Sequence, residues 1–320
     1  MMRPTAYFGI NIGGTRTTIT SSGLSDAPIA KRTIDIPTIE PEGTLRQATE
    51  LIEKWEPGDS PVIGVACGNP LDVSKGLITC PPNLPGWDKV PVVEMLQNTF
   101  GGQTYLMNDA NAGALAEWWF GAGRRCQHMA FITAGTGFGA GLILNGKLYE
   151  GVLGNAGEIG HLRLENDGPI GYGKAGSVEG FCSGGGIAQM GQAVATEYGG
   201  DVAFNPGPIE KITALHIGKA AEKGDPHAKE VLALAGRQMG KAIAILIDLL
   251  NPEVIVLGSI YARCRPFLEP EMRKILAEEA LEDSLHACDI RPAKLGEDLS
   301  AYAALSIGHY HQGRFEEETG

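Results

Sequence analysis

Apolar residues occur along this chain in short runs that end at glycine-rich turns, and these runs alternate with segments in which apolar residues recur at helical spacing. The short runs predict strands at residues 6–12, 17–21, 61–66, 103–107, 129–133, 139–144 and 253–258. Helical spacing predicts helices at 44–55, 110–121, 228–250 and 301–307. Strands that alternate with helices are typical of an α/β protein.

Two predicted turns share a Gly-Thr pair and lie in different halves of the chain. Gly14-Thr15 follows the first strand, and Gly135-Thr136 follows a strand 121 residues later. The repetition indicates either two related lobes that face each other or two unrelated hairpin turns, and the hairpins alone do not decide between these. Residues 67–91 are rich in proline and glycine and are predicted to form a long loop, which inside a compact domain usually has a function.

Composition and charge restrict the class of protein. A chain of 320 residues is typical of two domains, and 43% hydrophobic with 20% charged residues excludes a disordered chain. A net charge of −12 argues against general nucleic-acid binding, because phosphate contacts need stripes of Lys and Arg. The longest apolar stretch, residues 242–257, is interrupted by polar residues, so we expect no transmembrane helix and no membrane partner.

The cysteines and the chain ends point to a cytoplasmic protein. Six cysteines without a CxxC pair, together with the absence of a recognisable signal peptide, predict reduced thiols in the cytoplasm. The polar residues 314–320 are expected to fray.

The two Gly-Thr turns are candidate phosphate sites. Glycine leaves backbone N–H groups unshielded, and the threonine hydroxyl adds a donor. Either turn alone is weak evidence, and neither matches the GxxxxGK[ST] loop or a GxGxxG that opens a helix. A bound nucleotide would therefore lie between the two hairpins.

Polar residues with catalytic or ligand-binding chemistry follow predicted strands and turns. Asn108 and Asp109 lie where a strand meets a helix; one of them can cap the helix, and a carboxylate there can also accept a proton from a substrate hydroxyl. Glu158 and His161, three positions apart, can hydrogen-bond a polyol, although such a pair can also ligate a metal or simply lie on the surface. Glu179 lies at the start of a predicted helix. Its carboxylate could bind a ligand, or it could only cap the helix and interact favourably with the helix dipole.

Taken together, these segments resemble the ROK family (repressors, open reading frames and sugar kinases). The resemblance rests on GINIGGT at 9–15, MNDANAGALAE at 107–117, TAGTGFGAG at 133–141, NGKLYEG at 145–151 and AGEIGH at 156–161. It extends to NLPGW at 83–87, NPEVIVLG at 251–258 and LGED at 295–298, in family order over nearly the whole chain.

The resemblance implies a fold and an activity. The fold would be the α/β two-lobe, actin-like ATPase (ribonuclease H-like) fold with its active site in the interdomain cleft. The smaller lobe would comprise residues 1–118 plus 300–320, with the C-terminal helix packed back on it, and the larger lobe residues 119–299. The activity would be ATP- and Mg²⁺-dependent phosphorylation of a hexose or amino sugar by a homodimeric enzyme.

The resemblance also assigns roles residue by residue. Asp109 would be the general base, and an ordinary carboxylate pKa would suffice, because proton transfer can follow a loose transition state. Residues expected to bind the sugar are Asn69, Asn83, Asn108, Asp109, Glu158, His161 and Glu179. Residues expected to bind the nucleotide are Asn11, Gly13, Gly14, Thr15, Gly135, Thr136, Gly137 and Gly258.

This sequence departs from the family pattern at the first hairpin. Asn11 stands where the family usually has an aspartate that helps to hold hydrated Mg²⁺. A charged hydrogen bond contributes about 1.5–3 kcal/mol, so a rate reduced roughly 10- to 100-fold is expected, and Asn11→Asp should raise turnover or tighten the Mg²⁺ dependence. Two smaller departures are Asn69 in the sugar loop and Ser259 after the late strand, beside the adenosine pocket.

The second departure concerns a structural zinc site that many family members carry. The family pattern is Cys-x-Cys-Gly-x-x-Gly-Cys-x-Glu, and here Ile170, Tyr172 and Ser177 take the places of the three thiols. His161 alone cannot hold zinc, so we expect no bound zinc, with Ile170 and Tyr172 packing in its place.

An alternative function is a non-catalytic or weakly catalytic sugar-binding regulator of the same family. Family repressors carry an N-terminal helix-turn-helix of roughly eighty residues, and the first strand here begins near residue 6, so we expect no DNA-binding domain. The aspartate at position 109 favours the enzyme. The identity of the sugar is not predicted: glucose, mannose, fructose, N-acetylglucosamine and N-acetylmannosamine would use the same polar side chains.

Overall fold

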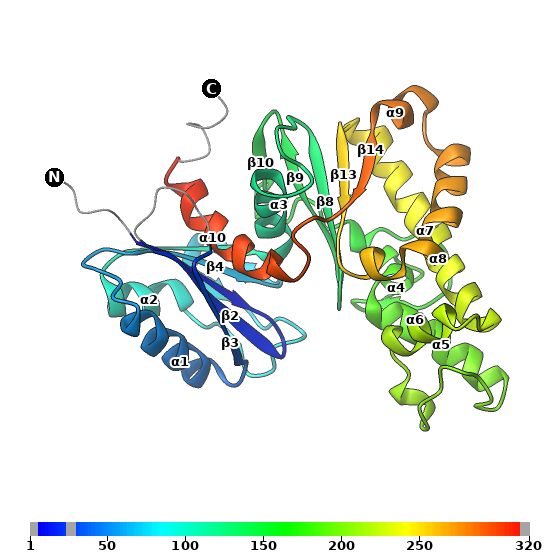
Figure 1. Cartoon of the computed structure of the whole chain (residues 1–320), viewed down its shortest axis with the longest axis horizontal. Coiled ribbons are helices and arrows are strands. Elements are labelled where there is room, and N and C mark those ends of the chain that lie inside the picture. The colour runs from blue at the N-terminus through cyan, green and yellow to red at the C-terminus, as the bar shows by residue number, and fades with distance from the viewer. Residues whose placement is uncertain (1–5, 24–29, 314–320) are drawn as a thin grey trace.

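The computed structural model describes residues 6–23 and 30–313, and its two main sheets have five strands each. Figure 1 shows the two sheets and the helices around them. The N-terminal sheet has the strand order β3-β2-β1-β4-β7, and the C-terminal sheet has the order β10-β9-β8-β13-β14. Numbered within each half, both sheets follow the order third, second, first, fourth, fifth. This shared topology favours two related lobes over two unrelated hairpins.

The N-terminal half contains the elements that were expected and several that were not. Its sheet consists of β1 (Tyr7–Ile12), β2 (Arg16–Gly23), β3 (Arg32–Pro37), β4 (Val62–Cys67) and β7 (Gln103–Asn108). Beside these lie α1 (Pro41–Lys54), α2 (Val92–Phe100) and the small elements β5 (Leu71–Asp72), η1 (Val73–Lys75) and β6 (Leu77–Ile78). The helix α3 (Asp109–Trp119) leads to the second half.

The C-terminal half begins with β8 (Met129–Ala134), β9 (Phe138–Leu144) and β10 (Lys147–Tyr149), and β13 (Val254–Leu257) and β14 (Asp289–Pro292) complete its sheet. Between β10 and β13 lie η2 (Ile159–His161), the hairpin β11 (Ile170–Gly171) and β12 (Lys174–Ala175), α4 (Val178–Cys182), α5 (Gly184–Glu197), η3 (Ile209–Lys211), α6 (Ala214–Glu222) and α7 (Pro226–Leu250). After β13 come α8 (Ile260–Glu279) and α9 (Glu282–Ala287), and after β14 come η4 (Gly296–Asp298) and α10 (Leu299–His311).

Two helices, α3 and α10, lie between the sheets and pack against each other (Figure 1). Glycines let both helices approach the strands closely: a Cβ at Gly64 of β4 would collide with the carbonyl of Ala304, and a Cβ at Gly141 of β9 would collide with that of Ala110. One hydrophobic cluster joins side chains of β7, α3, β8, β13 and α10. The C-terminal helix packs on β1 and β4, as the family resemblance implied.

The predicted strands and helices are present, with boundaries that differ by a few residues. The helices predicted at 44–55, 110–121, 228–250 and 301–307 correspond to α1, α3, α7 and α10. The segment predicted as a long loop, residues 67–91, contains the short elements β5, η1 and β6. The fraying expected at 314–320 lies outside the described residues.

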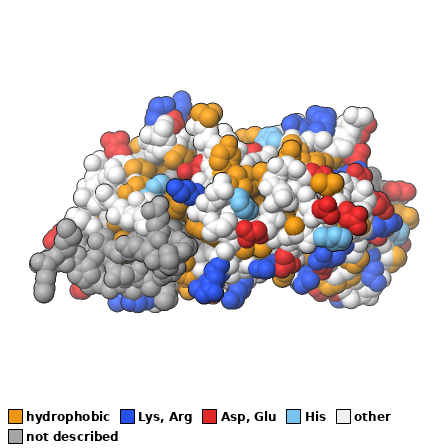
Figure 2. Space-filling model, turned by 90° about the horizontal axis from the view of Figure 1, so that it is seen from above, with side chains coloured by type: hydrophobic (Ala, Val, Ile, Leu, Met, Phe, Trp, Pro, Cys, Tyr) orange, Lys and Arg blue, Asp and Glu red, His pale blue; other side chains and the backbone are white. Residues whose placement is uncertain are grey.

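No helix among residues 6–23 and 30–313 is long and apolar enough to cross a membrane. Figure 2 shows one face of the molecule, on which basic and acidic side chains lie interspersed.

Candidate active site

A cleft of about 940 Å³ is lined by residues of both halves. Its walls include the turn after β1, the segment after β4, the start of α3, the turn after β8 and the region around η2 and α4. Segments distant in the sequence therefore meet at one site, at the carboxyl ends of parallel strands, where open α/β sheets usually bind ligands.

The first Gly-Thr turn joins β1 and β2 as a hairpin. Ile12 pairs with Thr17 across the strands, and the Gly13 N–H donates to the Arg16 carbonyl over 3.0 Å. Gly14 and Thr15 are exposed and line the cleft. A Cβ at Gly14 would lie 2.7 Å from the carbonyl oxygen of Asn83, so glycine lets the turn lie close to this neighbouring loop.

The second Gly-Thr turn joins β8 and β9 and is held by more contacts. The Gly135 N–H donates to the Gly137 carbonyl over 3.0 Å, and the Gly135 carbonyl accepts from the Gly184 N–H at the start of α5 over 2.8 Å. Glu179 of α4 accepts from the Phe138 N–H over 3.1 Å. The carboxylate of Glu179 thus fixes this hairpin as well as lining the cleft.

Asn108 and Asp109 have different places at the start of α3. The buried Asn108 is the N-cap, and its Oδ1 accepts from the Asn111 N–H over 2.7 Å. Asp109 is the first helical residue, and its side chain is open to the cleft. Capping therefore accounts for Asn108 and leaves the Asp109 carboxylate available for chemistry.

The surroundings of Asp109 raise the pKa of its carboxyl group. The main cause is desolvation, because the walls of the cleft surround the group although solvent reaches its surface. The charge of Glu158 raises the pKa further, and hydrogen bonds from the backbone N–H groups of Ala110 and Asp109 lower it in part. An ordinary carboxylate pKa would suffice for a general base, and the pKa of this candidate base is raised above it.

The polar residues expected to bind sugar line the same cleft as this carboxylate. Asn69 lies just after β4, and its Nδ2 donates to Glu158 Oε1 over 2.6 Å. This hydrogen bond links the two halves across the cleft. His161 contacts Tyr172 edge to face, with ring centroids 4.9 Å apart. Asn83 and His161 also line the cleft. The structure thus brings together all seven residues expected at the sugar.

Two residues expected at the nucleotide do not line the cleft. Asn11 is the second-to-last residue of β1, and its Nδ2 donates to the Ser300 carbonyl in α10 over 3.3 Å. Gly258 is buried behind the second hairpin, where its N–H donates to the Ile132 carbonyl over 2.9 Å. Conversely, Tyr172 and Asn155 line the cleft, and the sequence did not assign either of them to the site. The signal that could have found Tyr172 is its place at a thiol position of the family's zinc pattern.

The zinc-site segment does not offer a zinc ligand set. Among residues 6–23 and 30–313, no group of three or more His, Cys, Asp and Glu side chains could hold a metal ion. The three positions that hold thiols in the family pattern carry an aliphatic side chain, a phenol and a hydroxyl, which are poor zinc ligands compared with thiolate or imidazole.

Comparisons with known proteins match nearly the whole chain. The family model described as "ROK family" matches residues 7–310. A glucokinase of Thermotoga maritima is 29% identical over 93% of this chain and 96% of its own length, and a glucokinase of Halalkalibacterium halodurans is 32% identical over 91% of each chain. The DNA-binding transcriptional dual regulator NagC of Escherichia coli is 30% identical over 86% of this chain and 68% of its own length.

Solved structures share the fold. A ROK family glucokinase from Streptomyces griseus, in complex with glucose and AMPPNP, superposes with a TM-score of 0.77 at 27% identity and covers 94% of this chain and 98% of its own. The ROK hexokinase from Thermus thermophilus gives a TM-score of 0.79 at 25% identity, over 97% and 100% of the two chains. The actin-like two-lobe α/β fold is confirmed by these likenesses.

Proposed function

This chain belongs to the ROK family, and we propose that it is an ATP-dependent kinase that phosphorylates a hydroxyl group of a hexose or an amino sugar. One observation carries the proposal: the carboxylate of Asp109 opens into a cleft that both Gly-Thr hairpins line. A base for a hydroxyl and two phosphate-binding turns therefore face the same space. The similarity to glucokinases supports this assignment.

The sugar would lie between the start of α3, which carries Asp109, and the start of η2, where Glu158 lies. In this arrangement Asp109 accepts the proton of the hydroxyl that attacks phosphorus. Glu158, with the amide of Asn69 beside it, accepts from a neighbouring hydroxyl, and His161 donates to or accepts from another. The raised pKa of Asp109 makes it a stronger proton acceptor than an ordinary carboxylate.

The phosphates would lie between the turns at Gly13–Thr15 and Gly135–Gly137, whose N–H and hydroxyl groups can donate to them. No Lys or Arg occurs among the described residues that line the cleft. Charge neutralisation would therefore depend on backbone N–H groups and on Mg²⁺, which supplies positive charge at the transferring phosphoryl group when it is bound with ATP. This reasoning predicts a strict need for a divalent cation.

The test is ADP formation by the purified protein with ATP, Mg²⁺ and a panel of hexoses and amino sugars. We expect sugar-dependent ADP with at least one member of the panel. Asp109→Asn should lower this turnover by roughly 10²- to 10⁴-fold, the range typical of a general base, while sugar binding by calorimetry persists. No sugar-dependent ADP from the wild type, or full activity of Asp109→Asn, would contradict the proposal.

A second candidate function, sugar binding without turnover, is favoured by two observations. Asn11 carries no charge where the family usually has an aspartate, and regulators of the family are among the relatives. Saturable sugar binding without ADP formation at any Mg²⁺ concentration would identify this function.

A further inference from the structure

We propose that Tyr172 positions His161 and forms part of the sugar-side wall of the cleft, so that an aromatic contact here replaces the metal that many family members use to organise this loop. The inference rests on the proposed function only in naming sugar as the ligand. The contact between the two side chains is independent of any activity.

The β11–β12 hairpin that carries Tyr172 is anchored by ordinary hydrogen bonds. The side-chain amide of Gln189 in α5 accepts from the Ile170 N–H over 2.9 Å and donates to the Ile170 carbonyl over 2.8 Å. From the other strand, Lys174 Nζ donates to the backbone carbonyl of His161 over 2.6 Å. The hairpin is therefore tied both to a helix behind it and to the turn that carries His161.

Each position of the family's three thiols has a different contact here. Ile170 pairs with Gln189 through its backbone, and Ser177 Oγ accepts from the Gly180 N–H over 3.1 Å as the N-cap of α4. Tyr172 contacts the imidazole of His161 edge to face, at an interplanar angle of 76°. Hydrogen bonds and one aromatic contact thus order the loop. Among the described residues, no group of side chains there could hold a metal ion.

The backbone of Tyr172 is in an unfavourable conformation that points to a role for its ring. Its φ of +45° lies in the left-handed region, which a bulky side chain rarely adopts, and Gly173 follows at +76°. A turn alone would be better formed by Asn or Gly at this position. The ring nevertheless stays 55% exposed and lines the cleft instead of filling a core. Residues held in sparsely populated backbone conformations cluster at functional sites.

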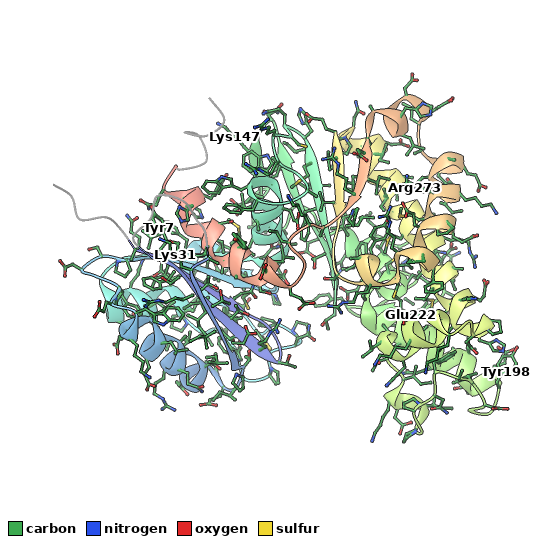
Figure 3. All side chains as sticks on the ribbon, in the orientation of Figure 1. Tyr7, Lys31, Lys147, Tyr198, Glu222 and Arg273 are labelled. Carbon is green, nitrogen blue, oxygen red and sulfur yellow. The ribbon has the colours of Figure 1, made fainter. Side chains whose placement is uncertain are left out.

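The chain offers a matched control in Tyr198. This tyrosine is 48% exposed and also contacts a histidine, His227, with ring centroids 4.3 Å apart. It lies at the end of α5, on the outer part of the C-terminal helices and away from the cleft (Figure 3). Removing its ring changes an equivalent tyrosine–histidine contact without touching the site.

The first experiment follows the His161 imidazole by NMR in histidine-labelled protein without ligands. We expect Tyr172→Ala to shift and broaden the His161 resonances, Tyr172→Phe to restore them, and Tyr198→Ala to leave them unchanged. His161 resonances that are the same in wild type and Tyr172→Ala would overturn the positioning role. Stoichiometric zinc in the purified protein by elemental analysis would overturn the replacement of a metal.

The second experiment measures steady-state kinetics with the best sugar of the panel. Tyr172→Ala should raise the KM for sugar about 3- to 10-fold, the size expected for one aromatic contact, and leave the KM for ATP unchanged. Tyr172→Phe should restore the sugar KM, and Tyr198→Ala should behave as wild type. An unchanged sugar KM in Tyr172→Ala would overturn the wall role. A wild type without sugar-dependent ADP would instead refute the proposed function, and calorimetric sugar binding would then test the wall role.

Discussion

Asp109 combines access from the cleft with surroundings that disfavour its charge. The raised pKa means that ionisation of this group costs folding stability: the neutral form is favoured in the folded state, so its stabilising contribution is present at low pH and is lost as pH rises through the folded-state pKa. The charged form of this candidate base is therefore held at the expense of stability. We expect Asp109→Asn, which removes that charge, to unfold at the same temperature as wild type or higher while losing activity.

The pH dependence of the reaction gives a test of the neighbour that raises this pKa. A general base works when deprotonated, so kcat/KM should rise with pH through the raised pKa of Asp109. Glu158→Gln removes the charge that contributes to the shift, while its carbonyl can still accept from Asn69. We expect the acid limb of the profile to move to lower pH in this variant. A limb that stays in place or moves to higher pH would show that Glu158 does not act on Asp109 through its charge.

Asn11 now has a structural contact that an aspartate could not make. Its amide donates to the Ser300 carbonyl, and a carboxylate would place an acceptor against an acceptor. Asn11→Asp and Asn11→Ala should both lower the free energy of unfolding by about 1 kcal/mol, measured in urea, because both lose this donor. We expect Asn11→Asp alone to raise turnover or to lower the Mg²⁺ concentration that it needs. Identical kinetics in the two variants would show that charge at this position has no part in Mg²⁺ binding.

At the scale of elements, the packing of helices on strands depends on particular glycines. The sequence shows that glycine is abundant but does not show which glycines lie against a helix. Gly64→Ala would place a Cβ against the Ala304 carbonyl and push α10 from the sheet. We expect the free energy of unfolding to fall by about 1–3 kcal/mol in urea denaturation, as is usual for overpacking. The control is Gly185→Ala in the first turn of α5, where a Cβ would meet nothing closer than 3.8 Å. Equal stabilities of the two variants would contradict the close packing of α10.

Elements with a strong periodic pattern were predicted from the sequence, and elements without one were not. The strands β1, β4 and β8 are buried runs, and α7 has apolar residues at helical spacing over its length. By contrast, β3 is an edge strand with only Ile36 buried, so no alternation marks it. The helix α8 contains Pro266 and Pro270, which ordinarily indicate that a helix ends.

The candidate site was predictable to a similar degree. The two Gly-Thr hairpins and the Asn108-Asp109 pair are recognisable from neighbouring residues in the sequence. The structure places all three on one cleft. The positions of Asn11 and Gly258 depend on which way a strand residue faces and on how deep a strand end is buried, and neither follows from a motif. Tyr172 was not assigned to the site although it occupies a thiol position of the family's zinc pattern, because its contact with His161 arises only when the β11–β12 hairpin folds.

At the scale of the whole molecule, two sheets of the same topology share the packed helices α3 and α10 (Figure 1). The chain passes between the halves twice, after α3 and before α10, and Glu117 ties the two passages together. Its fully buried carboxylate accepts from the Ala122 N–H over 2.7 Å and from the backbone N–H groups of Lys294 and Leu295. The cleft therefore opens between halves that are joined firmly on one side.

This architecture accounts for a site that neither half could form alone. The amide of Asn69 comes from the N-terminal half and meets Glu158 of the C-terminal half, and one hairpin comes from each sheet. The proposed general base, Asp109, lies on α3, the helix that the two halves share. In-line phosphoryl transfer, which depends on positioning, would thus be controlled by how the two halves are held.

The most direct measurement is a crystal structure with a non-hydrolysable ATP analogue and a sugar that the protein phosphorylates bound together. A carboxylate oxygen of Asp109 should lie within about 2.6–3.2 Å of one sugar hydroxyl, the reach of a general base, and that hydroxyl should face the terminal phosphate. A sugar whose phosphate-facing hydroxyl has no contact with Asp109 would contradict the account.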